Sequence, residues 1–107
     1  MTAWDIFTGD LGFGPHLLVV ISHQARAERR DFVEVLQCSS QRANRPAHSY
    51  EVILDAADGL DWPTFCNCDL IWAIPRSDLQ ERRGSVGPER RRAIVATIIR
   101  THGWVGI

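Results

Sequence analysis

Residues 14–22, GPHLLVVIS, combine a glycine-proline turn with an almost unbroken run of apolar residues. A continuous apolar run is typical of a strand that is covered on both faces, whereas a strand with one wet face alternates. His16 is the exception, because it is a polar side chain at the start of the run. The stretch therefore predicts a buried strand that begins with a histidine, and the role of that histidine is the main question about the chain.

Segments with the composition and spacing of strands lie on both sides of this run. A glycine-rich loop, residues 8–15, precedes it, and a polar connection with room for about one helical turn follows it. Pro75 ends the longest apolar segment, which is either one long strand or two consecutive ones, and a turn with a short strand comes next. The main predicted strands are residues 3–7, 16–22, 31–40, 50–54 and 64–74.

The last predicted element is an amphipathic helix. Pro88 suits its first position and Gly103 suits its end. Several short strands followed by one such helix predict a mainly β (α+β) fold, a small barrel or strongly curved sheet of about five to seven strands with the helix packed on it. The apolar stripe that would face the sheet consists of Ile94, Val95, Ile98 and Ile99.

Size and composition indicate one small globular domain. A chain of 107 residues is close to the common size of a domain, so we expect a single domain over residues 1–107. Its 45% apolar and 23% charged residues are ordinary for such a domain. No apolar run approaches the ~20 residues of a membrane span, and the acidic N-terminal segment does not resemble a signal peptide. We therefore expect a cytoplasmic protein.

The cysteines and the basic residues indicate what to expect about disulfides, metal sites and nucleic-acid binding. Cys38, Cys66 and Cys68 are an odd number, which argues against a secreted disulfide framework. A metal site would need more ligands than the closely spaced Cys66 and Cys68, so we expect buried thiols and neither a metal nor another cofactor. All 12 basic residues are arginines, which suit contacts with phosphates and bases. The net charge of −1 nevertheless gives no general reason to infer nucleic-acid binding.

Taken in order, six segments resemble the MazF/PemK/Kid toxins of bacterial toxin–antitoxin systems. No single motif is specific, but the six follow one another without a break along essentially the whole chain. The resemblance implies an SH3-like barrel, a homodimer, a small antitoxin protein as partner, and metal-independent cleavage of single-stranded RNA. The segments are WDIF (4–7), GPHLLVVIS (14–22), VEVLQCSSQ (33–41), SYEVIL (49–54), CNCDLIWAIPRSDL (66–79) and RRGSVGPERRRAIVATI (82–98).

Cleavage of this kind uses the 2′-hydroxyl of the RNA as nucleophile. It needs a group that takes the hydroxyl proton, a group that protonates the leaving 5′-oxygen, and hydrogen-bonding or positive groups around the phosphate. The resemblance places His16 where the family has its catalytic arginine, and Ser39 where it has its catalytic threonine. An imidazole exchanges protons near neutral pH, and serine has the donor hydroxyl of threonine. As structural alternatives, His16 can cap its strand by bonding a loop carbonyl, and Ser39 can bond its own backbone.

The resemblance adds further candidates around this pair. Asp69 matches an acidic residue of the family and is a third candidate catalytic residue, although it can instead accept structural hydrogen bonds from a turn. Asn67 stands where some members have a basic residue. Arg42 and Arg45 can supply that missing cation, although a solvated loop is the simpler interpretation of both. The predicted RNA-binding residues are thus Ser40, Arg42, Arg45 and Asn67.

Two other functions stay open. The chain ends in GWVGI (103–107), and the related CcdB gyrase poisons end in Trp-Gly-Ile on the same fold, so the tail Trp104–Ile107 could serve a protein-binding poison. The missing arginine and the shortened first loop, residues 8–15, also fit a catalytically inactive binding module. The sequence does not define the RNA target or the antitoxin.

Overall fold

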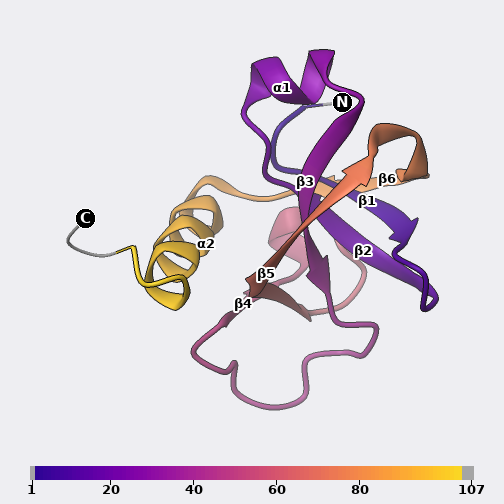
Figure 1. Cartoon of the computed structure of the whole chain (residues 1–107). Helices are drawn as coiled ribbons and strands as arrows, with labels where there is room; N and C mark the ends of the chain where they lie inside the picture. The colour runs from indigo at the N-terminus through magenta and orange to yellow at the C-terminus, as the bar shows by residue number, and fades with distance from the viewer. Residues whose placement is uncertain (1, 105–107) are drawn as a thin grey trace.

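The computed structural model describes residues 2–104 and shows one curled antiparallel sheet of six strands with a helix packed beside it (Figure 1). The strands follow the order β4-β5-β3-β2-β1-β6 across the sheet. The mainly β fold with a C-terminal helix is therefore confirmed. The elements are β1 (Asp5–Asp10), β2 (Pro15–Val20), α1 (Gln24–Arg29), β3 (Phe32–Cys38), β4 (Glu51–Leu54), η1 (Ala56–Asp58), β5 (Thr64–Pro75), η2 (Arg76–Asp78), β6 (Arg82–Ser85) and α2 (Pro88–Thr101).

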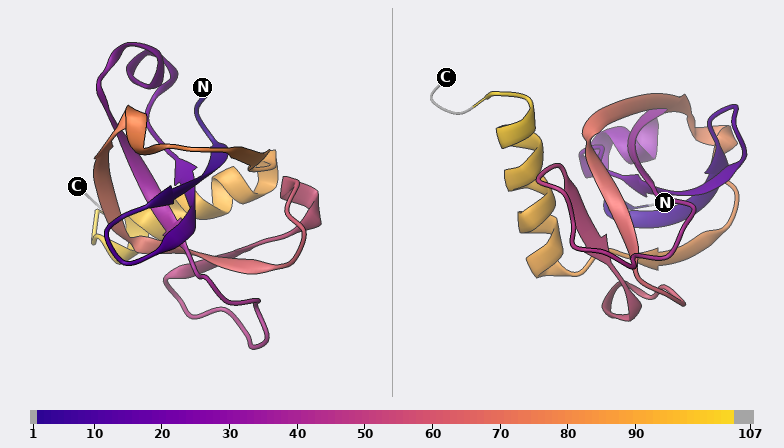
Figure 2. Two further views of the ribbon diagram at one scale, coloured as in Figure 1. Left: turned by 90° about the vertical axis from the view of Figure 1, so that its right-hand side faces the viewer. Right: turned by 90° about the horizontal axis from the view of Figure 1, so that it is seen from below.

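The curl of the sheet nearly closes it into a barrel, and α2 lies along the outside next to β4 and β5 (Figure 2). The long apolar segment after Pro63 is one strand of 12 residues, β5, and not two. Its first part pairs with β4 and its second part pairs with β3. One bent strand thus connects the edge of the sheet to its centre. In the part of the chain that the structure describes, no helix has the length and hydropathy that a membrane crossing requires.

β2 is covered on both faces, as its unbroken apolar run predicts. Leu18 and Val20 belong to one hydrophobic cluster, which also contains Val33 and Val35 of β3. Val19 lies in a second cluster, to which α2 contributes Ile94 and Ile98. Alternate residues of the strand therefore enter two different parts of the core. The three cysteines are buried in the second cluster as free thiols, which confirms the prediction of buried thiols: Cys38, Cys66 and Cys68.

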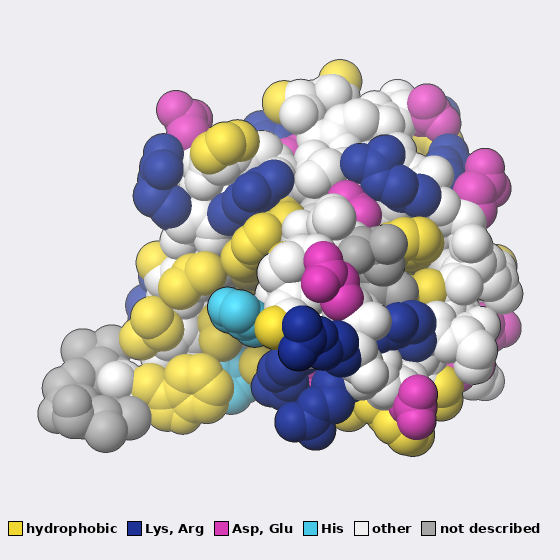
Figure 3. All heavy atoms as spheres, turned by 90° about the horizontal axis from the view of Figure 1, so that it is seen from above, with side chains coloured by type: hydrophobic (Ala, Val, Ile, Leu, Met, Phe, Trp, Pro, Cys, Tyr) yellow, Lys and Arg dark blue, Asp and Glu magenta, His cyan; other side chains and the backbone are white. Residues whose placement is uncertain are grey.

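Two local predictions are wrong. β1 extends to Asp10, through residues that the glycine content assigns to a loop, because Thr8, Gly9 and Asp10 pair with β2. The apolar stripe of α2 is divided, because Ile94 and Ile98 face the sheet while Val95 and Ile99 are exposed. Figure 3 shows hydrophobic side chains exposed along this helix, at the left of the view. Adjacent helical positions are rotated by about 100°, so a narrow contact with the sheet buries part of the stripe.

Candidate active site

The register of β2 and β3 aligns the histidine with the serine. The two strands pair at Val20↔Val35, Val19↔Leu36 and Leu18↔Gln37, and the pairing ends there. Two more steps of the same register would put His16 opposite Ser39. The strands separate at this point instead of pairing, and a cavity of about 150 Å³ lies between His16 and Ser39. The structure therefore brings the two predicted catalytic side chains to the same opening.

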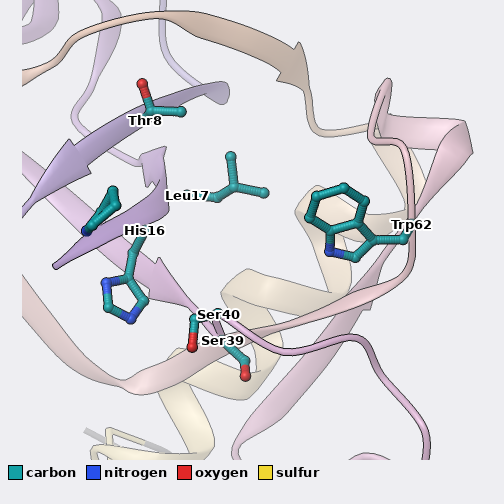
Figure 4. Close-up of a pocket in the computed structure, with 7 residues that line it drawn as sticks. Thr8, His16, Leu17, Ser39, Ser40 and Trp62 are labelled. Carbon is teal, nitrogen blue, oxygen red and sulfur yellow. The ribbon is translucent and has the colours of Figure 1, made fainter.

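This cavity, which we call the His16 cavity, is open to solvent and has mixed walls (Figure 4). His16 lies on one side, the two serines lie near it at the end of β3, and Trp62 lies on the opposite side. The cavity thus combines an imidazole, hydroxyl groups and an aromatic ring. Its complete lining is Thr8, Pro15, His16, Leu17, Ser39, Ser40 and Trp62.

One hydrogen bond fixes the orientation of the His16 ring. Nδ1 of His16 lies 2.9 Å from the carbonyl oxygen of Gly14, and since a carbonyl oxygen accepts, Nδ1 is the donor. In the neutral ring the lone pair is then on Nε2, which can accept a proton. Phe13 packs edge-on against the same ring, with the centroids 5.5 Å apart. The bond to a loop carbonyl is the structural alternative predicted for His16, and here it also leaves Nε2 as the proton acceptor.

Ser39 is held by its backbone and retains a hydroxyl proton to donate. Its amide donates to the carbonyl of Phe65 at 2.8 Å, and its carbonyl accepts from the Thr64 hydroxyl at 2.8 Å. Its Oγ accepts from the amide of Gln41 at 3.2 Å. Within residues 2–104 this hydroxyl makes no hydrogen bond as a donor, so its proton can point to a ligand. The bond to its own backbone, the alternative for Ser39, is therefore compatible with binding.

A second cavity of about 140 Å³ lies on the other side of Ser39. Asn67 contributes to it, so this predicted RNA-binding residue lies near the predicted catalytic serine. Arg45 stacks over Phe65, with its Cζ atom 4.2 Å from the ring centroid, and hydrogen-bonds both oxygens of Glu51 at 2.8 and 3.0 Å. These bonds from Arg45 hold the pKa of the Glu51 carboxyl below its ordinary value. The charge of Arg45 is thus neutralised within the protein.

The remaining candidates lie at different places. Asp69 is exposed on β5 and lines neither cavity, and its amide donates to Oδ1 of Asn67 at 2.7 Å. Ser40 lines the His16 cavity next to Ser39. Arg42 does not line it, but its Cζ atom lies 5.3 Å from the ring centroid of Trp62. The structure therefore groups the histidine, the serines, Asn67 and the two arginines around two adjoining cavities, with Asp69 outside.

Sequence reasoning missed part of the cavity wall. The glycine content predicts a loop at Thr8, whereas β1 continues through this residue, which lines the cavity. Trp62 received no role, although a tryptophan in a segment rich in glycine, aspartate and proline is a recognisable signal. Pro15 and Leu17 flank His16 on β2 and complete the wall. Their presence follows from the position of the histidine on its strand.

The fold defines a class of small proteins built on a curled antiparallel β sheet with a C-terminal helix. A model of the family described as PemK-like, MazF-like toxin of type II toxin–antitoxin system matches residues 3–102. The chain therefore belongs to the PemK/MazF-like toxin family of type II toxin–antitoxin systems.

Several solved structures share this fold. An endoribonuclease in complex with its cognate antitoxin from a mycobacterial species superposes with a TM-score of 0.83, at 20% identity, over 96% of this chain and 95% of the other. The Mycobacterium tuberculosis toxin MazF-mt6 gives 0.80 at 20% identity, over 92% and 96% of the two chains. A MazE-MazF structure from Deinococcus radiodurans gives 0.76 at 13% identity, over 96% and 95%. No curated protein sequence gave a match. At these identities the structures support the fold alone.

Proposed function

We propose that the protein is an endoribonuclease toxin that cleaves single-stranded RNA through its own 2′-hydroxyl, without a metal ion. The observation that carries the proposal is the His16 cavity, in which an oriented imidazole and a hydroxyl with a free proton face the same space. The family assignment and the endoribonuclease among the similar structures agree with it. In this proposal the imidazole acts as the base, where relatives have a guanidinium.

The reaction begins when Nε2 of His16 takes the proton of the attacking 2′-hydroxyl. The 2′-oxygen forms a bond to phosphorus, the bond from phosphorus to the 5′-oxygen breaks, and the 5′-oxygen takes up a proton from solvent water. The products are a 2′,3′-cyclic phosphate and a 5′-hydroxyl end. The hydroxyls of Ser39 and Ser40 donate to the non-bridging phosphate oxygens, where negative charge grows in the transition state. His16 returns to its neutral form by losing its proton to solvent.

The histidine can carry out the first step better than an arginine can. A guanidinium stays protonated at neutral pH and does not accept a proton, whereas a neutral imidazole does. The bond from Nδ1 to Gly14 aligns the ring and assigns the lone pair to Nε2. Replacement of the arginine is therefore compatible with activity. The assignment of Asp69 as a catalytic residue stays a prediction, and a normal rate in an Asp69→Asn variant would contradict it.

The antitoxin partner and the homodimer are also part of the proposal. Of the three similar structures named above, one is described as a complex with a cognate antitoxin and one as MazE-MazF. We expect a second, small protein to bind and inhibit this chain, and we expect two copies of the chain to associate. Sedimentation equilibrium of the purified chain measures its mass directly. A monomeric mass across micromolar concentrations would contradict the homodimer.

The test of the proposed function is cleavage of a long unstructured RNA in EDTA, with cut sites mapped at single-nucleotide resolution. Wild-type protein should cut and leave 2′,3′-cyclic phosphate ends, and His16→Ala should lose about 10²- to 10⁴-fold in rate, the usual contribution of a general base. His48→Ala is the matched control, because His48 stacks on Tyr50 and does not line the His16 cavity. Equal rates for wild type and His16→Ala, or cleavage that EDTA abolishes, would contradict the proposal.

The same experiment separates the two other functions. Intact RNA together with trapped gyrase–DNA complexes would indicate a gyrase poison, and no effect of either kind would indicate a binding module. Residues 105–107 of the CcdB-like tail lie outside the described residues. Trp104 is exposed and packs on His102 with the ring centroids 4.9 Å apart. This local contact gives the poison no particular support.

A further inference from the structure

We propose that Trp62 is the stacking platform for an unpaired nucleobase next to the cleaved phosphate, with Arg42 fixed behind it. This inference rests on the proposed function, since it identifies how the same site holds its RNA. Trp62 lines the His16 cavity on the side opposite the histidine (Figure 4). A base on Trp62 and the phosphate between His16 and Ser39 would then occupy one continuous cavity.

Packing in the hydrophobic core does not explain the presence of a tryptophan at position 62. Trp62 belongs to neither hydrophobic cluster, and 37% of its surface is exposed. The apolar anchors of this segment are its neighbours Leu54 and Leu60, which are buried. A large aromatic ring left open at a cavity is typical of binding surfaces, because it offers much contact area at a small cost in conformational entropy.

The platform is rigidly connected to the predicted catalytic serine. The carbonyl of Pro63 accepts a hydrogen bond from the amide of Ala43 at 2.8 Å, and Ala43 follows Ser39 by four positions. The Thr64 hydroxyl donates to the carbonyl of Ser39 at 2.8 Å. The amide of Ser39 in turn donates to Phe65 at 2.8 Å. These bonds tie the residues that follow Trp62 to the residues that flank Ser39, so the spacing between base and phosphate is preset.

Arg42 contacts the Trp62 ring through a cation–π interaction. Its Cζ atom lies 5.3 Å from the centroid of the Trp62 ring, and Arg42 is not part of the cavity wall. We therefore place the base on the part of the ring that lines the cavity, which Arg42 does not enter. Arg45 cannot take this part, because Glu51 already holds it through two hydrogen bonds. Within residues 2–104 Arg42 has no carboxylate partner, so its charge can attract the RNA backbone. The two loop arginines therefore have different roles.

Stacking makes a specific demand on the substrate. Every base has an aromatic face, so a platform tolerates all four bases but requires that the base be unpaired and present. Loss of one such stacked base, or of the aromatic ring, typically weakens binding about 5- to 100-fold. Selection of single-stranded RNA would then arise at Trp62, independently of any base-specific contact elsewhere.

The test uses a short RNA whose attacked nucleotide carries a 2′-deoxyribose, so that it binds without being cut. Affinity is measured by fluorescence anisotropy for this RNA and for versions with an abasic ribose at each position in turn. The affinity of wild-type protein should fall about 5- to 100-fold when the base is missing at one position beside the blocked site. Trp62→Leu should bind the intact RNA weakly, and its affinity should not change when that base is missing. Trp62→Phe should retain most of the affinity. Trp104→Leu, an exposed tryptophan away from the cavity, is the matched control and should behave as wild type.

The outcomes separate this inference from the proposed function. If wild type cleaves RNA but Trp62→Leu shows the same abasic penalty as wild type, the platform is refuted while the ribonuclease stands. If wild type neither binds nor cleaves RNA, both are refuted. Should Trp62→Leu fail to fold, the abasic series on wild type together with Trp62→Phe still decides, because a wild type that is indifferent to every missing base overturns the platform. Replacement of the stacked base by the other three should change affinity by less than about threefold, as stacking is tolerant of sequence.

Discussion

Arg90 should be the most important single charge for the stability of the fold. Its Nη1 donates to Oδ1 of Asp55 and to Oδ2 of Asp58, each at 2.7 Å, and its Nη2 donates to Oδ2 of Asp55 at 3.0 Å. These bonds fasten the first turn of α2 to η1, the turn that leads into the segment of Trp62. Asp58 has no exposed side-chain surface, whereas the side chains of Arg90 and Asp55 are 30% and 35% exposed.

We expect Arg90→Met to destabilise the protein by about 2–3 kcal/mol. Removing one partner of a buried ion pair typically costs about 3–5 kcal/mol, because it leaves the other charge buried and uncompensated. The expected cost lies below this range, because Arg90 and Asp55 are partly exposed to water, which screens their charges. In addition, Asp58 keeps two backbone donors at 2.9 Å, the amides of Gly87 and Asp55. Methionine retains the apolar stem, so the change isolates the guanidinium.

The assay is urea unfolding followed by circular dichroism. With a slope of about 1–3 kcal/mol per molar for a small domain, the midpoint should fall by about 0.7–3 M. Arg92→Ala is the control, because Arg92 is exposed on the same helix and forms no ion pair within residues 2–104. A midpoint shift for Arg90→Met no larger than that of the control would refute the reasoning.

The same variant predicts a dependence on pH. Hydrogen bonding by Arg90 lowers the pKa of Asp55 in the folded protein. A carboxyl whose folded pKa is depressed contributes stability above its unfolded pKa, about 4, and this contribution is lost as the pH falls through the folded pKa. The difference in stability between wild type and Arg90→Met should therefore be largest near neutrality and shrink below about pH 4. A difference that stayed constant down to pH 2 would contradict the role of Asp55.

Two more predictions concern the fold and the proposed active site. Gly84→Ala should destabilise by about 1–3 kcal/mol in the same urea assay, because the new Cβ would lie 2.2 Å from the carbonyl oxygen of Asp58 and backbone would have to move. Ser39→Ala should lower the cleavage rate about 10²- to 10³-fold while Ser39→Thr retains it, as expected for a lost donor to the phosphate; equal rates for the two variants would exclude that donor.

The patterns that predicted the fold correctly are those that report burial. The unbroken apolar run of β2 follows from its place between two hydrophobic clusters, and Pro88 begins α2 as its fixed backbone angle suggests. Errors arose where pairing or packing overrides local preference. Gly9 is part of β1 because this strand pairs with β2 at that position. Val95 is exposed because α2 contacts the sheet along a narrow strip. Composition alone does not contain either of these long-range effects.

The candidate site could likewise be predicted only as far as local patterns and family resemblance reach. Resemblance to a family singled out His16 and Ser39, but their meeting depends on the register of β2 with β3, which no local pattern specifies. Trp62 reaches the cavity through a loop whose course is fixed by hydrogen bonds to residues about twenty positions earlier, including the bond of Pro63 to Ala43. Such contacts are not encoded in any local sequence pattern, so the sequence predicts His16 and Ser39 as candidates but does not predict that Trp62 lines the same cavity.

In the proposed reaction, a histidine at the place that the resemblance gives to the family's catalytic arginine would change when positive charge is present at the phosphate. A guanidinium is charged before and after the substrate binds, whereas His16 as the proposed base would become a cation only when it takes the proton of the 2′-hydroxyl. The charge then appears as negative charge grows on the phosphate, which favours the transition state over the bound substrate. Ground-state binding must in consequence come from other groups. Arg42, whose charge no carboxylate within residues 2–104 neutralises, and the exposed ring of Trp62 lie where they can supply it.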